Sequence, residues 1–268
     1  MKRYHEAPLS IFKDVQKVTD GDYALVHLFR DNPDYLEAFR KAVAEGRDVI
    51  LDNSLFELRE PFDPDLFMFW IKNLKPTWYI VPDCWKNGKK TSEMFHQFMD
   101  RYYDLPGKAI GVAQGNDTAE VAECYKSIEP RCDMVAFSLD FASYSGLPAW
   151  GVPYPIRMSI GRTRIVKELY EQGIINTNKP HHLLGCGVPQ EVMWYPIEWK
   201  NSWLRSIDTC NPVIHGMQGV RYNPDLPGLA TKSSTKMCDK MDAPVCAAQL
   251  KVIMENIEMM REMVEFDG

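Results

Sequence analysis

The sequence predicts an α/β fold, a (β/α)8 barrel formed as a single domain over residues 1–268. Apolar, strand-like runs alternate with helix-like stretches along most of the chain, and about eight such runs can be counted. The length also suits one barrel of this class. An open doubly wound sheet is the alternative, but no G-x-G-x-x-G stretch follows the first strand, which disfavours a dinucleotide-binding fold.

Each predicted strand is a short apolar run that ends near a polar residue or a glycine. Residues 1–22 are mixed and polar, so we expect them to form an N-terminal extension that covers one barrel end. The first strand is then 23–29, and the last is a short run at 212–216. The strands between them are predicted at 48–52, 78–83, 108–115, 133–139, 181–187 and 205–210.

Helix signals fill the intervals between these strands. Asn32-Pro33 and Asp63-Pro64 each place a capping side chain before a proline, and Gly46 ends the first helix. The segment 244–266 is predicted to be a long amphipathic helix rich in Met and Glu. Further helices are predicted at 91–103, 118–128, 160–172 and from Pro189, with a loop at 140–159 and irregular structure at 223–242.

Composition narrows the class of protein. Hydrophobic residues make up 45% of the chain, and no run of about 18 apolar residues or N-terminal apolar signal segment occurs, so we predict a soluble protein without a membrane span. A net charge of −6 leaves nucleic-acid binding to a local basic patch. Seven cysteines without a C-x-x-C pair predict reduced thiols in the cytoplasm, and we expect no metal and no cofactor.

Polar side chains stand at the ends of four predicted strands. Asp52, Asp83, Gln114 and Asp208 occupy these positions, and the carboxyl ends of barrel strands meet at one mouth. Asp52 and Asp208 would suit a double displacement at a sugar C1′, with Asp208 as the nucleophile. Asp83 could accept hydrogen bonds from a flat heterocycle, and the Gln114 amide offers both a donor and an acceptor. The alternative for each is a helix cap, a turn or a buried group bonded to backbone amides.

Glycines, histidines and basic residues supply the remaining candidates. Gly185 and Gly187 could let a ligand approach the backbone, although tight turns also use glycine. His181 and His182 begin a strand, so we predict structural roles for both. His215 follows the Asp208 strand, so we predict that it lies near the substrate and contacts a phosphate or acts as an acid or base. Two basic stretches are candidate phosphate contacts, with solvated faces as the alternative. They contain Arg157, Arg162, Arg164, Lys167, Lys232, Lys236 and Lys240.

Taken together, five stretches resemble the tRNA-guanine transglycosylase superfamily, including its DNA-modifying branch that inserts 7-deazaguanines. The residues Asp-Asn-Ser-Leu-Phe-Glu at 52–57 stand for the family's Asp-Ser-Gly-Gly-Phe-Gln stretch. The other matches are Asp83-Cys84, the Gly-x-x-Gln-Gly stretch at 111–115, Leu-Leu-Gly-Cys-Gly at 183–187 and Ile-Asp-Thr-Cys at 207–210. The resemblance covers about residues 45 to 215, in the family's order.

The resemblance implies a role for each matching position. Asp208 would displace guanine and hold the sugar C1′, and Asp52 would be the general acid or base for the incoming base. Asp83 and Gln114 would read the hydrogen-bonding edge of the base, and Phe56 would stack on one of its faces. The rest of the base site would be formed by Gly115, Leu184 and Gly185.

The chain also departs from the family pattern. No cysteine-rich zinc site is recognisable near the C-terminus, Ser54-Leu55 replace the double glycine, and Asn-Pro-Val-Ile-His at 211–215 replaces the usual basic run. A compact chain without the zinc module is most similar to the phage-type branch that acts on DNA. The expected partners are therefore DNA and a 7-deazaguanine base.

The predicted function is an exchange of guanine in DNA for a 7-deazaguanine such as preQ0, which makes the chain a pentosyltransferase. The alternatives are a tRNA substrate, or a nucleoside or glycoside hydrolase that uses the same carboxylates with water as the acceptor. A barrel that binds a nucleobase or a protein partner without turnover is a third hypothesis. The final helix could pack on the barrel or on a second subunit, which would give a homodimer.

Overall fold

The computed structural model describes residues 1–223 and 235–266. The chain divides into two compact units by its internal contacts. Unit 1 comprises Met1–Asp20, Ser138–Asn178 and His182–Gly268, and unit 2 comprises Gly21–Phe137 and Lys179–His181. The chain therefore passes from unit 1 into unit 2 twice, at residues 21–137 and 179–181, and returns to unit 1 each time.

The fold class is α/β, as predicted. The described residues form an eight-stranded sheet in the order β1-β8-β7-β6-β5-β4-β3-β2, which is the strand order of a (β/α)8 barrel with β1 and β2 at the ends of the order. The five pairings with a described register are parallel. The strands are β1 Lys2–Tyr4, β2 Asp22–Leu25, β3 Val49–Asp52, β4 Trp78–Ile80, β5 Lys108–Ala113, β6 Met134–Phe137, β7 His181–Leu183 and β8 Leu204–Asp208.

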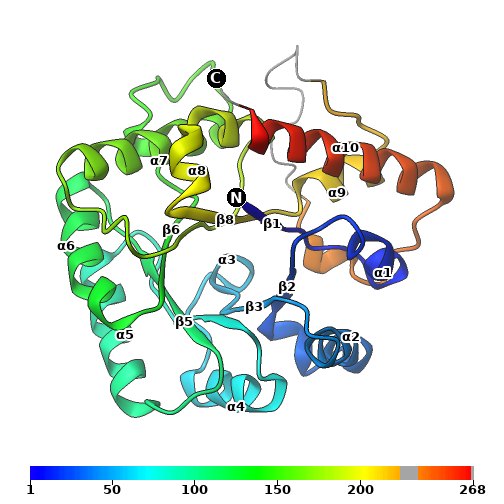
Figure 1. The fold of residues 1–268 in the computed structure, drawn as a ribbon, viewed down its shortest axis with the longest axis horizontal. Coiled ribbons are helices and arrows are strands. Elements are labelled where there is room, and N and C mark those ends of the chain that lie inside the picture. The colour runs from blue at the N-terminus through cyan, green and yellow to red at the C-terminus, as the bar shows by residue number, and fades with distance from the viewer. Residues whose placement is uncertain (224–234, 267–268) are drawn as a thin grey trace. The chain divides into compact units, whose positions relative to one another are not determined.

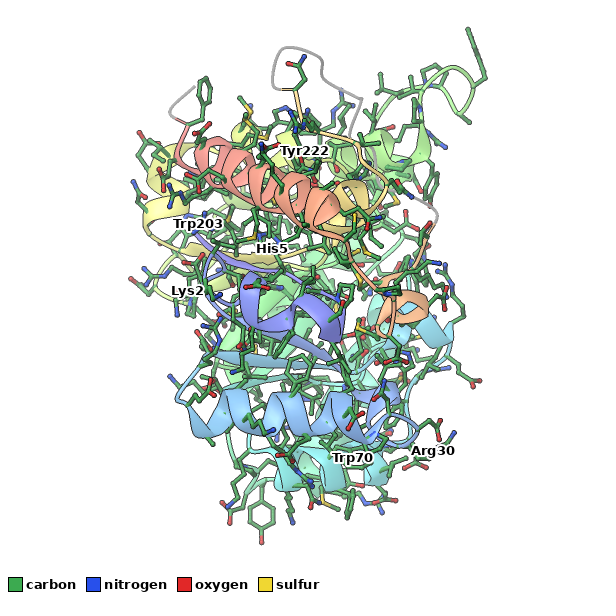
Figure 2. All side chains as sticks on the ribbon, turned by 90° about the vertical axis from the view of Figure 1, so that its right-hand side faces the viewer. Lys2, His5, Arg30, Trp70, Trp203 and Tyr222 are labelled. Atoms are coloured by element: carbon green, nitrogen blue, oxygen red, sulfur yellow. The ribbon has the colours of Figure 1, made fainter. Side chains whose placement is uncertain are left out.

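Unit 2 contains β2 to β6 with their connecting helices. Asn32 and Asp63 cap the helices that follow them, each accepting a backbone N–H bond at 2.9 Å, as the Asn-Pro and Asp-Pro signals predict. The helices α5 and α6 run side by side (Figure 1). Trp70, labelled in Figure 2, packs its ring against Phe29 at 5.5 Å. The helical segments are η2 Val26–Phe29, α2 Pro33–Ala44, α3 Leu55–Leu58, α4 Pro64–Leu74, α5 Gly88–Arg101, α6 Thr118–Ile128 and η3 Glu129–Arg131.

Unit 1 contains β1, β8 and the long C-terminal helix α10, Ala247–Glu265, which confirms the predicted final helix. This helix lies against α9, Asn211–Met217 (Figure 1). A Cβ added at Gly216 would lie 2.4 Å from Ile253 Cγ1, so the two helices need glycine at this contact. The other helical segments are η1 Leu9–Ile11, α1 Phe12–Val15, η4 Ala142–Tyr144, α7 Tyr154–Glu171, η5 Pro189–Trp194, α8 Ile197–Asn201 and η6 Met237–Lys240.

The N-terminal segment differs from the prediction. Residues 2–4 are not part of an extension but form strand β1, which pairs in parallel with β8 and places Tyr4 opposite Asp208. Three residues are too few to show an alternating pattern, so backbone pairing rather than side-chain polarity defines this strand. The predicted strand 23–29 ends at Leu25, and a 3-10 helix follows it.

Two further boundaries are corrected. The run 212–216 is not a strand but lies within α9, where Pro212 occupies the first turn and its fixed φ favours a helix. Helix α7 already begins at Tyr154, inside the predicted loop 140–159, because Pro155 is tolerated in a first helical turn. Among the described residues, no helix has both the length and the apolar character needed to cross a membrane.

Candidate active-site clusters

Asp208 and Asp83 each belong to a group of neighbouring polar residues, one group in each unit. The Asp208 cluster of unit 1 consists of His5, His182, Gly185, Ser206 and Asp208. The Asp83 cluster of unit 2 consists of Asp52, Asn53, Ser54, Asp83 and Gln114. Each cluster stands at or beside the carboxyl ends of strands, which is where a parallel α/β fold carries its chemistry.

Asp208 is the last residue of β8, and its side chain is held through one oxygen. The residue is only 4% exposed. Its Oδ1 accepts hydrogen bonds from His182 Nε2 at 2.9 Å and from the Gly185 backbone N–H at 2.7 Å. Among residues 1–223 and 235–266, no group donates to Oδ2. The carboxylate is therefore fixed in direction through Oδ1.

His182 links two positions on the neighbouring strand. Its Nδ1 lies 2.8 Å from Ser206 Oγ, and its Nε2 faces Asp208 Oδ1. Ser206 and Asp208 are two residues apart on β8, so they share one face of the strand and a single imidazole can span both. With Nε2–H donating to the carboxylate and the Ser206 hydroxyl donating to Nδ1, all three groups have a hydrogen-bond partner.

The two adjacent histidines have different surroundings. We predicted structural roles for both, and His181 matches that expectation: it stacks on Tyr125 with parallel rings 5.7 Å apart, and burial lowers its pKa to about 4. His182 instead contacts the candidate nucleophile directly. The alternation of a strand places neighbours on opposite faces, and this was the sequence signal that could have separated the pair.

His5 follows β1 and was not singled out from the sequence. Its Nδ1–H donates to the Thr209 carbonyl at 3.0 Å (His5 is labelled in Figure 2). Burial lowers its pKa to about 4, so the ring is neutral at physiological pH. Its Nε2 is buried and has no hydrogen-bond partner within the described part of the chain. The side chain was missed because residues 1–22 were interpreted as an extension.

Arg162 is a predicted phosphate contact, but in this structure it binds the protein itself. The residue is 0% exposed, and its Nε donates to Glu191 Oε1 at 2.7 Å. Its Nη1 and Nη2 donate to the backbone carbonyls of Leu184 and Gly185, both at 2.8 Å. The guanidinium therefore presents no exposed face to a phosphate, and it holds the turn that contains Gly185, where φ is +71°.

The other basic residues that we predicted as phosphate contacts differ in their exposure and contacts. Arg157 is half-buried with its guanidinium 5.1 Å from the Tyr154 ring centroid, and Arg164 is exposed. Lys236 is half-buried just before η6, whereas Lys232 lies outside the described residues.

His215 and Leu184 complete the predicted residues of unit 1. His215 is buried in α9, where its Nδ1–H donates to the Asn211 carbonyl at 2.9 Å, and its ring lies 5.9 Å from that of Tyr222. Leu184 is half-buried directly before Gly185. Leu184 thus adjoins the Asp208 cluster, while His215 is bonded within its own helix.

In unit 2, Asp83 is held through both of its oxygens. Asn53 Nδ2 donates to Oδ1 and Gln114 Nε2 donates to Oδ2, each at 2.8 Å. The backbone N–H of Lys86 donates to Gln114 Oε1 at 3.1 Å, which fixes the amide orientation. Burial raises the pKa of Asp83 to about 6, although the hydrogen bonds from Gln114 and Asn53 act in the opposite direction. The structure thus brings the predicted residues Asp83 and Gln114 into direct contact.

The turn after β3 supplies Asn53 and fixes Asp52. Asn53 also donates to the Val81 carbonyl at 3.1 Å and accepts from Leu55 N at 3.0 Å, so it ties the ends of β3 and β4 together. Asp52 Oδ2 accepts from the Ser54 N–H at 2.9 Å. Ser54 has a φ of 62°, a left-handed conformation that glycine adopts most readily, and the resembled family has glycine at this position.

Phe56 belongs to an aromatic group that also contains Trp85 and Arg59. The Phe56 and Trp85 ring centroids are 5.7 Å apart, and the Arg59 guanidinium carbon lies 4.5 Å from each centroid. Flat rings with a cation over them are suited to stacking on another planar group. Trp85 stands two residues after Asp83, a position that sequence reasoning could have flagged, whereas the approach of Arg59 depends on a turn.

Gly115 has a packing explanation. A Cβ at this position would lie 2.7 Å from Val121 N, so glycine is needed where the end of β5 meets α6.

Comparisons with known proteins leave the family undetermined: no protein-family model and no curated protein matches the chain. Within the described ranges, no group of three or more His, Cys, Asp or Glu side chains is placed to hold a metal ion.

Proposed function

We propose that this protein is a guanine transglycosylase, which exchanges guanine in a nucleic acid for a 7-deazaguanine such as preQ0. The observation that carries the proposal is the Asp208 carboxylate, which is buried at the end of β8, held through Oδ1 and without a donor to Oδ2 in the described part of the chain. A nucleophilic carboxylate needs this combination of fixed direction and one accessible lone pair. The proposal favours DNA over tRNA, following the resemblance to the compact branch.

The proposed reaction has two displacements. Asp208 Oδ2 attacks C1′ of the sugar, the C1′–N9 bond breaks, and guanine leaves with the bonding electrons and takes up a proton. The incoming 7-deazaguanine then gives its N9 proton to a base and attacks C1′, which releases the Asp208 carboxylate. Asp52 is proposed as the proton donor and acceptor. Two inversions retain the configuration at C1′.

Base recognition is assigned to the Asp83 cluster. With a pKa of about 6, Asp83 is mostly ionised at neutral pH and can accept hydrogen bonds from the N–H groups of a guanine edge. The contact between Gln114 and Asp83 fixes both polar groups before a ligand arrives. Phe56 and Trp85 provide rings for stacking on the base.

The proposal also includes a compartment and an assembly. All seven cysteines are free thiols, which fits a reducing cytoplasm. The proposed assembly is a homodimer through α10, in which Met260 and Met263 are buried and Met254 and Met259 are half-buried.

The test is incubation of the protein with DNA, and separately with tRNA, with and without preQ0, followed by nuclease digestion and mass spectrometry of the nucleosides. We expect the 7-deazaguanine nucleoside to appear and free guanine to be released in equal amounts, only when preQ0 is present. Guanine release without an incoming base would instead identify a hydrolase.

The variants decide whether Asp208 is the nucleophile. Asp208→Asn keeps the shape of the side chain but removes the nucleophilic charge, so exchange should be lost. Asp117→Asn is the matched control, because Asp117 caps α6 through Glu120 N and asparagine caps equally well. Full exchange by Asp208→Asn, or no turnover of any of these substrates by the unaltered protein, would overturn the proposal.

A further inference from the structure

The peptide group between Leu184 and Gly185 is hydrogen-bonded on both sides. Its carbonyl oxygen, from Leu184, accepts from Arg162 Nη1 at 2.8 Å, and its N–H, from Gly185, donates to Asp208 Oδ1 at 2.7 Å. Because the peptide group is planar and rigid, the bond on one side sets the direction of the bond on the other. A charged donor on the carbonyl also polarises the group and strengthens the N–H as a donor.

Arg162 is itself held rigidly. Its Nε is bonded to Glu191 Oε1 at 2.7 Å, and both side chains are fully buried. Its Nη2 donates to the Gly185 carbonyl at 2.8 Å, so one planar guanidinium holds two successive carbonyls and one carboxylate. Tyr195 OH donates to the same Glu191 oxygen at 3.0 Å. The ammonium group of a lysine lacks this planar set of donors and could not bond all three acceptors in the same geometry.

The surrounding backbone leaves the turn little freedom. A Cβ at Gly187 would lie 2.6 Å from the Pro155 carbonyl oxygen, so the turn is pressed against the first residues of α7. Gly185 takes a positive φ of 71°, which side-chain-bearing residues rarely adopt. The turn is thus held by close packing on one side and by Arg162 on the other.

We propose that Arg162 is a positioning residue for Asp208: it fixes the Leu184–Gly185 peptide so that the Gly185 N–H holds Oδ1 and leaves Oδ2 facing the substrate. Its effect on catalysis rests on the proposed function, whereas the mechanical link from Arg162 to Asp208 does not. The role that we propose for Arg162 is therefore to position Asp208 rather than to contact a phosphate.

The simplest competing explanation is that the buried Arg162–Glu191 pair only stabilises the fold. Buried ion pairs often behave this way, and losing one partner is costly because the other charge is left buried. A purely structural pair would change the stability of the protein when altered but would leave the Gly185 N–H bond as it is. The decisive readout is therefore the Gly185 amide rather than the melting temperature.

The sequence makes this amide easy to observe. Leu184-Gly185 is the sole Leu-Gly step in the sequence, so labelling with carbonyl-¹³C leucine and ¹⁵N glycine gives one cross-peak in a carbonyl-filtered amide spectrum. The wild-type protein, Asp208→Asn and Arg162→Lys are compared by the chemical shift and hydrogen-exchange rate of this amide. Arg47→Lys is the matched control, because Arg47 forms a similar ion pair with buried Asp22 at 2.6 Å in unit 2.

We expect the Gly185 amide in Arg162→Lys to shift upfield and to exchange about tenfold to a hundredfold faster, as befits a weakened bond to a charged group. Asp208→Asn should move the same peak, and Arg47→Lys should not. If Arg162→Lys fails to fold, the double variant Arg162→Met with Glu191→Gln removes both charges and is measured instead. An unchanged Gly185 amide in a folded Arg162 variant, or in Asp208→Asn, overturns the inference.

Activity separates this inference from the proposed function. In the base-exchange assay, Arg162→Lys should lower kcat by about ten- to a hundredfold, while KM for the nucleic acid should change about twofold at most. The reason is that the variant alters only the orientation of the Asp208 carboxylate. If the unaltered protein exchanges no base, the proposed function fails but the amide measurement still decides the link. If exchange occurs and the amide does not respond, only the positioning role fails.

Discussion

The Asp208 and Asp83 clusters each bury one carboxylate with two hydrogen-bond donors, yet they distribute those donors differently. Both donors of Asp208 meet Oδ1, whereas Asp83 receives one donor on each oxygen. The first arrangement leaves Oδ2 of Asp208 without a donor in the described part of the chain, and the second fixes both oxygens of Asp83 while each can still accept a further hydrogen bond. Burial is nearly equal, at 4% and 2% exposed, so the two carboxylates differ in the placement of their donors rather than in burial.

The kinds of donor differ as well. Asp208 is held by an imidazole and a backbone N–H, and Asp83 is held by two primary amides. Amides keep a constant charge, so the Asp83 network changes only when the carboxyl group itself takes up a proton. If Asp208 is the nucleophile and Asp83 reads the base, as proposed, substitutions at the two positions should have different effects.

The largest expected difference is in activity. Asp208→Asn should lower kcat for base exchange by about 10⁴-fold or more, because a covalent step has lost its nucleophile. Asp83→Asn should lower kcat/KM by roughly a hundred- to a thousandfold, because an NH₂ group would face an amide donor and a polar contact to the base would be lost. Steady-state kinetics on both variants, with circular dichroism to confirm folding, checks this. Equal losses would remove the distinction between the clusters.

The second expectation concerns His5 of the Asp208 cluster. Burial lowers its folded-state pKa to about 4, so the unfolded chain binds more protons between pH 4 and 6.5. Stability should therefore fall as the pH is lowered through this window, by about 3 kcal/mol from this group. Urea denaturation of wild type and His5→Asn across the window measures the difference, since an asparagine amide can still donate to the Thr209 carbonyl. Parallel pH curves would contradict the assignment.

Asp83 should act in the opposite sense over nearly the same pH range. Its folded-state pKa is raised to about 6 by burial, so the folded protein binds more protons than the unfolded chain between pH 4 and 6. Stability should fall by about 3 kcal/mol as the pH rises through this window. Asp83→Asn should lose this dependence, and the same urea series detects it. A variant that keeps the wild-type slope would show that another group is responsible.

The smallest expected effect is on stability, and it compares the turn at Gly185 with the turn at Ser54. Gly185 and Ser54 both have positive φ, 71° and 62°, but only one of them is glycine. Gly185→Ala should destabilise the protein by about 1–2 kcal/mol through left-handed strain, whereas Ser54→Gly should change stability by less than about 1 kcal/mol. For Ser54, relief of strain is offset by a more flexible unfolded chain and by loss of the long 3.4 Å contact from His27 N. Thermal unfolding of both variants compares them, and a larger loss for Ser54→Gly would reverse the expected order.

The fold was largely predictable because strand and helix signals repeat through most of the chain. The capped starts of α2 and α4 and the long α10 follow from local residue chemistry. The order of the strands was predictable for the same reason, since alternation restricts parallel topologies. β1 was missed because its three residues owe their conformation to pairing with β8, which lies far along the chain.

The short run 212–216 was misassigned for a different reason. A brief Val-Ile segment is compatible with either a strand or a helix, and its apolar pattern is too short to decide. Pro212 was the local signal for a helix start, because proline favours the first turn. For the run 212–216, the fixed φ of Pro212 was therefore a better indicator of helix than the length and apolar pattern of the run.

Polar residues after apolar runs indicated the candidate carboxylates and amides, as with Asp83 and Gln114, which lie three residues beyond the end of β4 and one residue beyond the end of β5. The partners of these groups were harder to predict. Neither Arg162 nor His182 differs in its local sequence from an ordinary charged or strand residue, and each is identified only by the atom it meets: the Leu184 carbonyl for Arg162 and Asp208 Oδ1 for His182. Sequence position indicated the candidate carboxylates, and the fold supplied their neighbours.

The complete burial of Arg162 and Glu191 also has an evolutionary consequence. A change of either residue alone would strand an opposite charge away from water, so single substitutions should be selected against while paired replacements survive. Descendants of a common ancestor should accordingly inherit this arginine and glutamate together, or have exchanged both for uncharged side chains. Lineages in which the two positions drift independently would indicate that the pair is not maintained as one unit.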